Sequence, residues 1–216
     1  MSGYTTNLQH VIEDVAQGKP IIIVDSDDRE AEGDLMISAD KANPTNLAFM
    51  ALHGRGIMCL PCTSDYLTRL EIPMMHSNKL DKFATPFANS IDASYGISTG
   101  VSVEDRLKTI EIFLDKNSIP SELAQPGHLF PLRARNGLLL ERQGHTEAGV
   151  VLCHLAGTQP VAVIIEIMNN DGSMAKSEQL IEFAKVHNLA IVTIDELQDI
   201  YQQYLLRRRL SYDSDN

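Results

Sequence analysis

The residues best suited to chemistry form the hexapeptide Arg29-Glu30-Ala31-Glu32-Gly33-Asp34, which follows the apolar run Ile21–Val24 and a short acidic turn. Carboxylates at this density repel one another unless a cation or a proton holds them together. A hard divalent ion, which prefers oxygen ligands, matches them best. The Arg29 guanidinium suits a phosphate or a carboxylate. By itself, the stretch is equally consistent with a solvated acidic loop.

A second candidate site is the stretch Arg142-Gln143-Gly144-His145-Thr146-Glu147. Gly144 lies where a helix is expected to begin, and free backbone N–H groups there could bind a phosphate together with Arg142 and Thr146. His145 could serve as a metal ligand or a base. The simpler interpretation is a capped helix with a surface histidine.

Two single residues complete the chemical inventory. Glu166 interrupts the apolar run Val161–Ile167, where burial would raise the pKa of a carboxyl group toward a range useful for acid–base catalysis. His128 follows Pro126-Gly127, which could fix its loop rigidly. Both residues could instead be purely structural. Metal-assisted enolisation of a phosphorylated polyhydroxy compound would use all of these groups.

The surrounding pattern predicts the elements that position these residues. Helices are expected at 7–17, 44–53, 102–115, 145–156, 177–186 and 195–208. Strands are expected at 21–24, 35–39, 57–60, 87–92, 96–100, 161–167 and 189–194, whereas 61–84 is expected to be irregular and 120–127 to break the chain. The irregular alternation of helices and strands favours an α/β (α+β) domain with a mixed sheet covered by helices.

Composition excludes several classes of protein. The net charge of −11 argues against nucleic-acid binding, and no apolar run approaches the length that a membrane span needs. Three cysteines, including the Cys59-Leu60-Pro61-Cys62 motif, form no disulfide framework and suit a reducing cytoplasm. The CxxC spacing leaves a redox role open, although free thiols at a strand end are the simpler interpretation.

The ordered motifs resemble those of the 3,4-dihydroxy-2-butanone 4-phosphate synthase family over about residues 8–204. The matching stretches are Asp27–Asp34, His53–Leu60, Gly100–Arg106, Pro126–Arg133, Gly144–Ala148 and Glu166 with Asn170–Ala175. The resemblance implies a three-layer α/β fold, and a cytoplasmic homodimer with active sites near the subunit interface. It also implies a single domain over 1–216, without the GTP cyclohydrolase II domain that many relatives carry.

The resemblance further implies the reaction and the residues that perform it. Ribulose 5-phosphate would be converted to 3,4-dihydroxy-2-butanone 4-phosphate and formate in riboflavin biosynthesis, through enolisation, dehydration, a skeletal shift and loss of C4. Glu30 and His145 would bind Mg²⁺ or Mn²⁺, with two ions in each site. The implied substrate contacts are Arg29, Glu30, Asp34, Asp92, Thr99, Arg142, Gln143, Gly144, His145, Thr146 and Glu166. The implied catalytic residues are His128, Glu166 and Glu32, with the proton-transfer steps unassigned among them.

The segment Phe87-Ala88-Asn89-Ser90 departs from the family's usual Phe-Thr-Val-Ser, and Gly96–Gly100 departs as well. One alternative is therefore a diverged paralogue that acts on another ketose phosphate. Another is a non-catalytic metabolite-binding module of the same fold.

Overall fold

The computed structural model describes residues 7–26, 29–76 and 85–214. Its centre is a mixed seven-stranded sheet in the order β4-β5-β3-β6-β2-β1-β7. Among the described strands, the pairs β1–β7 and β3–β5 are parallel and the other neighbours are antiparallel. The strands are β1 (Ile21–Val24), β2 (Gly33–Ser38), β3 (Cys59–Cys62), β4 (Ile91–Ala93), β5 (Leu123–Arg133), β6 (Ala162–Glu166) and β7 (Ala190–Thr193).

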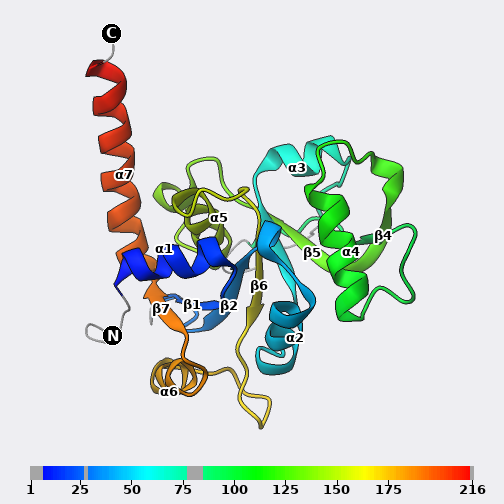
Figure 1. The fold of residues 1–216 in the computed structure, drawn as a ribbon, viewed down its shortest axis with the longest axis horizontal. Coiled ribbons are helices and arrows are strands. Elements are labelled where there is room, and N and C mark those ends of the chain that lie inside the picture. Colours follow the sequence, from blue (N-terminus) through cyan, green and yellow to red (C-terminus); the bar gives the residue numbers. More distant parts are fainter. Residues whose placement is uncertain (1–6, 27–28, 77–84, 215–216) are drawn as a thin grey trace.

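Helices cover both faces of the sheet, so the described chain has three layers (Figure 1). One face packs against α1 (Leu8–Gln17), α5 (His145–Leu155) and α7 (Ile194–Ser214). The other packs against α2 (Pro44–His53), α3 (Ser64–Arg69), α4 (Val103–Leu114) and α6 (Ser177–His187). Short 3₁₀ turns are η1 (Ala39–Lys41), η2 (Pro120–Glu122) and η3 (Leu138–Leu140). Figure 1 shows α7 extending away from the body of the molecule.

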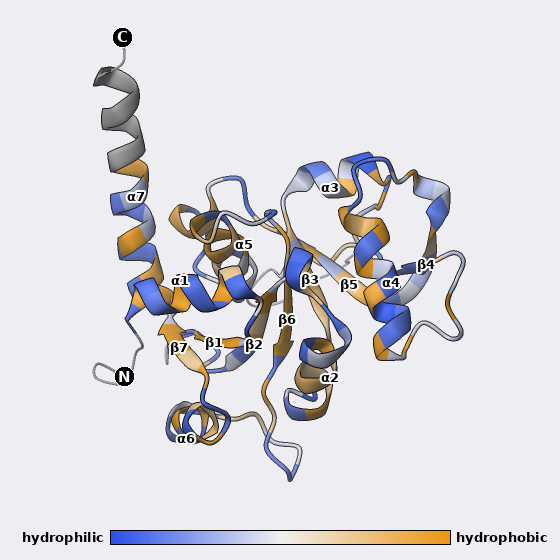
Figure 2. Cartoon of the chain, viewed as in Figure 1, coloured by the Kyte–Doolittle hydropathy of each residue, from blue (hydrophilic) through white to orange (hydrophobic). Residues whose placement is uncertain are grey.

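The apolar strands of the sheet are sandwiched between these helical layers. In β1, Ile21 and Ile23 pack on the α5 side, whereas Ile22 and Val24 pack on the α2 side. A strand buried on both faces has no polar face, which explains its continuous apolar run. Figure 2 shows the same contrast, with apolar colours on the central strands and polar colours on the outer turns of α1 and α2.

Local signals predicted most of the helices correctly. Asn7 and Ser102 accept backbone N–H bonds as the N-caps of α1 and α4. Asn43 forms a capping box with Asn46 ahead of α2, whose first residue is Pro44. The expected central strand is β6, which lies between β3 and β2. The predicted mixed sheet and its helical covering are therefore confirmed.

Four local expectations were wrong. Residues 64–69 form α3 within the segment expected to be irregular, of which 77–84 lie outside the described residues. Residues 96–100 form bends rather than a strand, and the strand expected at 57–60 begins at Cys59. The expected break around Pro126 is instead part of the long strand β5.

Long-range pairing explains the continuity of β5. Its ladder with β4 contains an irregularity between Ile91 and Asp92, which is where a strand tolerates proline and glycine. A Cβ at Gly127 would lie 2.0 Å from the Ile91 carbonyl carbon. Glycine is therefore required there because another backbone approaches closely, rather than to interrupt the strand.

We expect Asn43→Ala to lower the free energy of unfolding by about 1 kcal/mol. Asn43 accepts hydrogen bonds from the backbone N–H groups of Thr45 and Asn46, and alanine cannot replace them. Urea denaturation measures the change. Thr45→Ala, one position inside the helix, is the matched control and should have a much smaller effect. Equal losses in the two variants would contradict the capping role.

Candidate active site

A cavity of about 340 Å³ opens at one edge of the sheet and collects most of the predicted site residues. The loop between β1 and β2, the start of β2, the end of β6 and the N-terminus of α5 contribute to it. Its lining residues are Arg29, Glu30, Glu32, Asp34, Thr85, Phe87, Arg142, His145, Thr146, Ile164 and Glu166. The predicted hexapeptide and the predicted phosphate stretch therefore meet in space.

Asp25 organises the loop that carries the hexapeptide. Its Oδ2 accepts from Arg29 Nη1 at 2.8 Å and from the Glu30 N–H at 3.2 Å, while its Oδ1 accepts from the Glu32 N–H at 2.8 Å. The residue is only 4% exposed. Sequence reasoning did not select it, although an aspartate directly after a buried strand is a common means of binding loop N–H groups. Asp27 and Asp28, which belong to the matched motif, lie outside the described residues.

Asp25, Glu30 and His145 form a candidate metal site. One ligand atom from each lies within 4.8 Å of the others. His145 Nε2 is buried and has no hydrogen-bond partner in the part of the chain that the structure describes. Burial lowers the pKa of His145, so the neutral ring that binds metals predominates at neutral pH. An unpartnered imidazole nitrogen beside two carboxylates fits a divalent cation.

The remaining carboxylates increase the demand for positive charge. Burial raises the pKa of Asp34 well above its usual range, and the charges of Glu166, Glu30, Glu32 and Asp25 add to this. Asp34 Oδ1 accepts no hydrogen bond from any described residue. Burial also raises the pKa of Glu32, whereas Lys176, with its Nζ 3.8 Å from the Glu32 carboxylate, opposes the rise.

The residues at and just before the start of α5 present cationic and neutral donors to the cavity. Arg142 Nη1 lies 2.6 Å from the fully buried Glu147 carboxylate, and its Nη2 donates to Thr85 at 3.3 Å. A Cβ at Gly144, the N-cap residue, would lie 2.2 Å from Arg142 Nη1. Glycine at this position therefore leaves room for the guanidinium. The Gln143 side chain instead donates to Gln198 and does not line the cavity.

Glu166 is the last residue of β6 and lies opposite Asp34 in the β2 ladder. Its Oε2 accepts from the Ile57 N–H at 2.7 Å. The side chain was expected inside an apolar strand, but it is half-buried and lines the cavity. It is therefore positioned to contact a ligand.

His128, Asp92 and Thr99 lie in a second cluster, outside the lining of the cavity. His128 Nδ1 is 2.7 Å from Asp92 Oδ2, and the His128 N–H donates to Asp92 Oδ1 at 3.0 Å. Gly100 packs directly against this pair, and the neighbouring Thr99 N–H donates to Asp105 at 3.1 Å. Asp92 thus fixes the orientation of the histidine ring.

The sheet register relates the two clusters. Cys59 pairs with both Phe130 and Ile164, so Ile57 lies between His128 and Glu166. Neighbouring strands lie about 4.8 Å apart, and two such spacings separate β5 from β6, so the backbones of His128 and Glu166 are roughly 10 Å apart. Phe130 and Ile164 face α5. Side chains two residues apart in a strand point to the same face, so His128 and Glu166 also point to the α5 face of the sheet.

The three cysteines are buried free thiols. Burial raises the pKa of Cys59 and Cys62, and it raises the pKa of Cys153 to about 12. Nucleophilic thiolates are therefore scarce at neutral pH, and the packing of Cys59 and Cys62 in β3 accounts for the CxxC motif without a redox function.

Comparison with known proteins assigns the family. The family model described as 3,4-dihydroxy-2-butanone 4-phosphate synthase matches residues 9–200. The chain belongs to this family. It is 46% identical to the synthase of Photobacterium phosphoreum over 91% of this chain and 54% of that protein. It is 42% identical to the synthase of Photorhabdus laumondii over 94% of both chains.

A solved structure gives the same assignment. A synthase crystallised in complex with two magnesium ions has a TM-score of 0.83 and 35% identity, covering 89% of this chain and 94% of that one. The chain nevertheless spans only about half the length of several curated relatives that it matches. No helix among the described residues combines the length and apolar character needed to cross a membrane.

The synthase family's usual Phe-Thr-Val-Ser segment can now be placed. Phe87 lines the cavity, whereas Ala88 is fully buried and its N–H donates to the Pro131 carbonyl. Asn89 Nδ2 lies 3.4 Å from Gln125 Oε1. The departure at Ala88 therefore lies beneath the cavity wall rather than on its surface.

We expect Asp34→Asn to stabilise the metal-free protein by roughly 1 kcal/mol or more at pH 8. The raised pKa of Asp34 means that folding opposes its ionisation, so the destabilisation grows as pH rises through the range in which the unfolded side chain loses its proton. At pH 3, where both states retain the proton, the difference should largely disappear. Urea denaturation at the two pH values measures it. The exposed Asp199→Asn is the control, and a destabilised Asp34→Asn at pH 8 would contradict the argument.

Proposed function

We propose that this chain is a 3,4-dihydroxy-2-butanone 4-phosphate synthase, converting ribulose 5-phosphate to 3,4-dihydroxy-2-butanone 4-phosphate and formate in riboflavin biosynthesis. The observation that carries the proposal is the unpartnered His145 nitrogen beside Glu30 and Asp25, in the same cavity as Arg142 and Thr146. A sugar phosphate needs both a charge-stabilising centre and a phosphate site. Family membership supports the specific reaction.

Mg²⁺ or Mn²⁺ is the proposed cofactor, with two ions in each site, as the relative crystallised with two magnesium ions suggests. Glu30 and His145 would hold the metal, and Asp25 either supplies another oxygen or keeps the loop in place. A divalent ion there would polarise the substrate's oxygens and stabilise negative charge.

The chain's own residues would bind and orient the substrate. The phosphate is proposed to bind to Arg142, Thr146 and the backbone N–H groups at the start of α5. Gln143 and Gly144 would contribute through their backbone N–H groups. Arg29 and Asp34 would contact the sugar hydroxyl groups. We assign Arg142 a fixed orientation because Glu147 holds one edge of its guanidinium.

The proton transfers are proposed to involve Glu32, Glu166 and His128. Glu166 and Glu32 line the cavity and could exchange protons with the carbons and hydroxyl groups of the sugar. His128 would act from the side of β5, with its ring oriented by Asp92, and Thr99 would contact the substrate nearby.

We expect the purified protein to release formate from ribulose 5-phosphate only when Mg²⁺ or Mn²⁺ is present. Glu30→Gln and His145→Ala should each lower kcat/KM by about 100-fold or more, because charge stabilisation is lost. A coupled formate assay with and without EDTA measures this. His53→Ala, on α2 outside the cavity, is the control. Absence of metal-dependent formate would reject the proposed reaction and favour a paralogue or a binding module.

We further propose that residues 1–216 act as one domain and form a cytoplasmic homodimer with active sites near the subunit interface. The described residues share one sheet, and the described cysteines are free thiols. Three exposed apolar side chains lie close in the chain or in the sheet register to residues of the His128 cluster: Ile57, Tyr95 and Val101 are each 50% exposed. A partner subunit covering them would also close the side of the site near His128.

We expect analytical ultracentrifugation to show a dimer and Val101→Glu to weaken it, with a parallel loss of formate release. Val186→Glu is the matched control. Val186 is 67% exposed on α6, which contacts β7 at the end of the sheet farthest from β4 and β5. A fully active monomer, or equal effects of the two substitutions, would contradict this assignment.

A further inference from the structure

Two arginines near the end of β5 lack the partners that other arginines have. Neither the Arg133 nor the Arg135 guanidinium makes a hydrogen bond or ion pair with the described residues. By contrast, Arg29 binds Asp25 and Glu30, Arg55 binds the Met168 carbonyl, Arg69 binds the carbonyls of Phe113, Asp115 and Ser118, and Arg142 binds Glu147. The chain has 29 acidic and 18 basic residues, so potential partners are abundant.

Two carboxylates close to these arginines, those of Glu147 and Glu141, accept hydrogen bonds from other groups. Glu147 accepts from the Arg135 backbone N–H at 3.0 Å through Oε1 and binds Arg142 through Oε2. Glu141 Oε2 accepts from the Gly137 N–H at 3.0 Å. Among the described residues, neither carboxylate forms an ion pair with the Arg133 or Arg135 guanidinium, so these two half-buried groups keep donors for something else.

Arg133 and Arg135 flank the buried Ala134, and the three residues line one polar cavity of about 270 Å³. Ser64, Asn136 and Glu141 complete its wall. Residues two apart in an extended segment face the same side, which places both guanidinium groups toward the cavity. Two positive charges with hydroxyl and amide donors match a dianion with several acceptor oxygens, such as a phosphate monoester.

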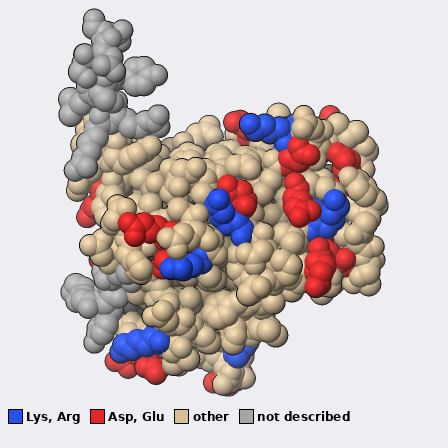
Figure 3. Space-filling model, viewed as in Figure 1, with Lys and Arg blue, Asp and Glu red and all other residues tan. Residues whose placement is uncertain are grey.

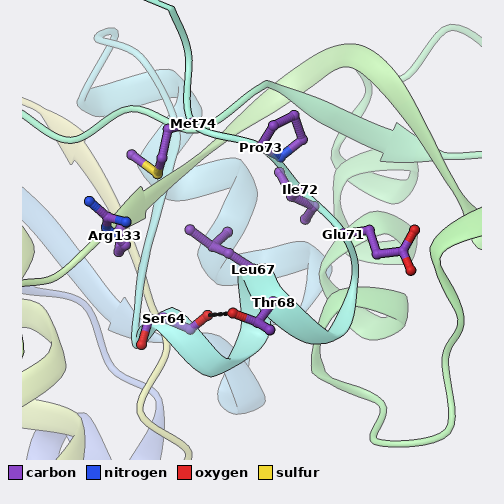
Figure 4. Close-up of a pocket in the computed structure, with 8 residues that line it drawn as sticks. All are labelled: Ser64, Leu67, Thr68, Glu71, Ile72, Pro73, Met74 and Arg133. Atoms are coloured by element: carbon purple, nitrogen blue, oxygen red, sulfur yellow. Dashed lines mark hydrogen bonds between the residues drawn. The ribbon is translucent and has the colours of Figure 1, made fainter.

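A second cavity, of about 320 Å³, adjoins the first, because Ser64 and Arg133 line both. Figure 4 shows Arg133 on one side of the apolar residues Leu67, Ile72 and Met74, and Glu71 on the other with its carboxylate directed away from them. An anionic group on the arginines would thus have apolar surface beside it. No lining residue is shared with the cavity that holds Arg142 and His145.

We propose that these two cavities form a second, non-catalytic site for an organic phosphate monoester. Arg133 and Arg135 bind the phosphate, and the side chains of Leu67, Ile72 and Met74 contact its apolar part. The site is separate from the proposed active site and does not depend on the reaction assigned to it.

Isothermal titration calorimetry with phenyl phosphate tests the proposal. The Arg142→Gln/Thr146→Ala variant removes phosphate binding at the active site and should still bind one equivalent per chain. Adding Arg133→Gln/Arg135→Gln should weaken that binding at least about tenfold, because two charge-assisted contacts are lost. Adding Arg55→Gln, which removes one positive charge elsewhere, should leave it unchanged. Inorganic phosphate should bind more weakly than phenyl phosphate, because it leaves the apolar cavity empty.

Three results would overturn the proposal. The first is no binding of phenyl phosphate, or binding that Arg133→Gln/Arg135→Gln does not weaken while the thermal melting temperature is unchanged. The second is equal affinity for phenyl phosphate and inorganic phosphate, which would exclude the apolar part. The third is a change of oligomeric state in Arg133→Gln/Arg135→Gln, which would make these arginines interface residues. Formate release by Arg133→Gln/Arg135→Gln alone should equal that of the unmodified protein, which separates this test from the proposed reaction.

Discussion

Repulsion among carboxylates at one edge of the sheet is the constraint on which the site depends. Pairing of β2 with β6 sets Asp34 opposite Glu166, and the β1–β2 loop adds Asp25, Glu30 and Glu32. Burial strengthens the interactions among these charges and weakens their solvation. Among the described residues, Asp34 Oδ1 and His145 Nε2 have no hydrogen-bond partner. A divalent cation at Glu30 and His145 would offset part of this negative charge and give the His145 nitrogen a partner.

Two buried ion pairs give this edge its shape. Asp25 binds Arg29 and the loop N–H groups, and Glu147 binds Arg142 behind the start of α5. Removing one partner from such a pair leaves an uncompensated buried charge, which costs far more than losing a surface ion pair. Both pairs therefore fix the direction of an arginine that lines the cavity. Glu147 also accepts from the backbone N–H of Arg135, whereas the Arg135 guanidinium has no partner among the described residues.

Tertiary pairing also divided the predicted site residues into two groups. Glu30, Asp34, Arg142, His145 and Glu166 share a cavity because β2, β6 and the start of α5 meet there. His128, Asp92 and Thr99 lie two strands away, on the side of β4 and β5. Their spacing along the chain gave no sign of this separation. It follows from the strand order, in which β3 lies between β5 and β6.

The sequence alone determined the features that depend on neighbouring residues. These include the capped helices α1, α2 and α4, the apolar strands β1 and β6, and the chemical character of Arg29–Asp34 and Arg142–Thr146. Caps and apolar runs act within a few residues, so a local pattern predicts them. Only the tertiary structure decided the continuity of β5 through Pro126-Gly127, the loop-organising role of Asp25 and the unpaired state of Arg133 and Arg135. Each depends on contacts between segments far apart in the sequence, and local periodicity carries no information about such contacts.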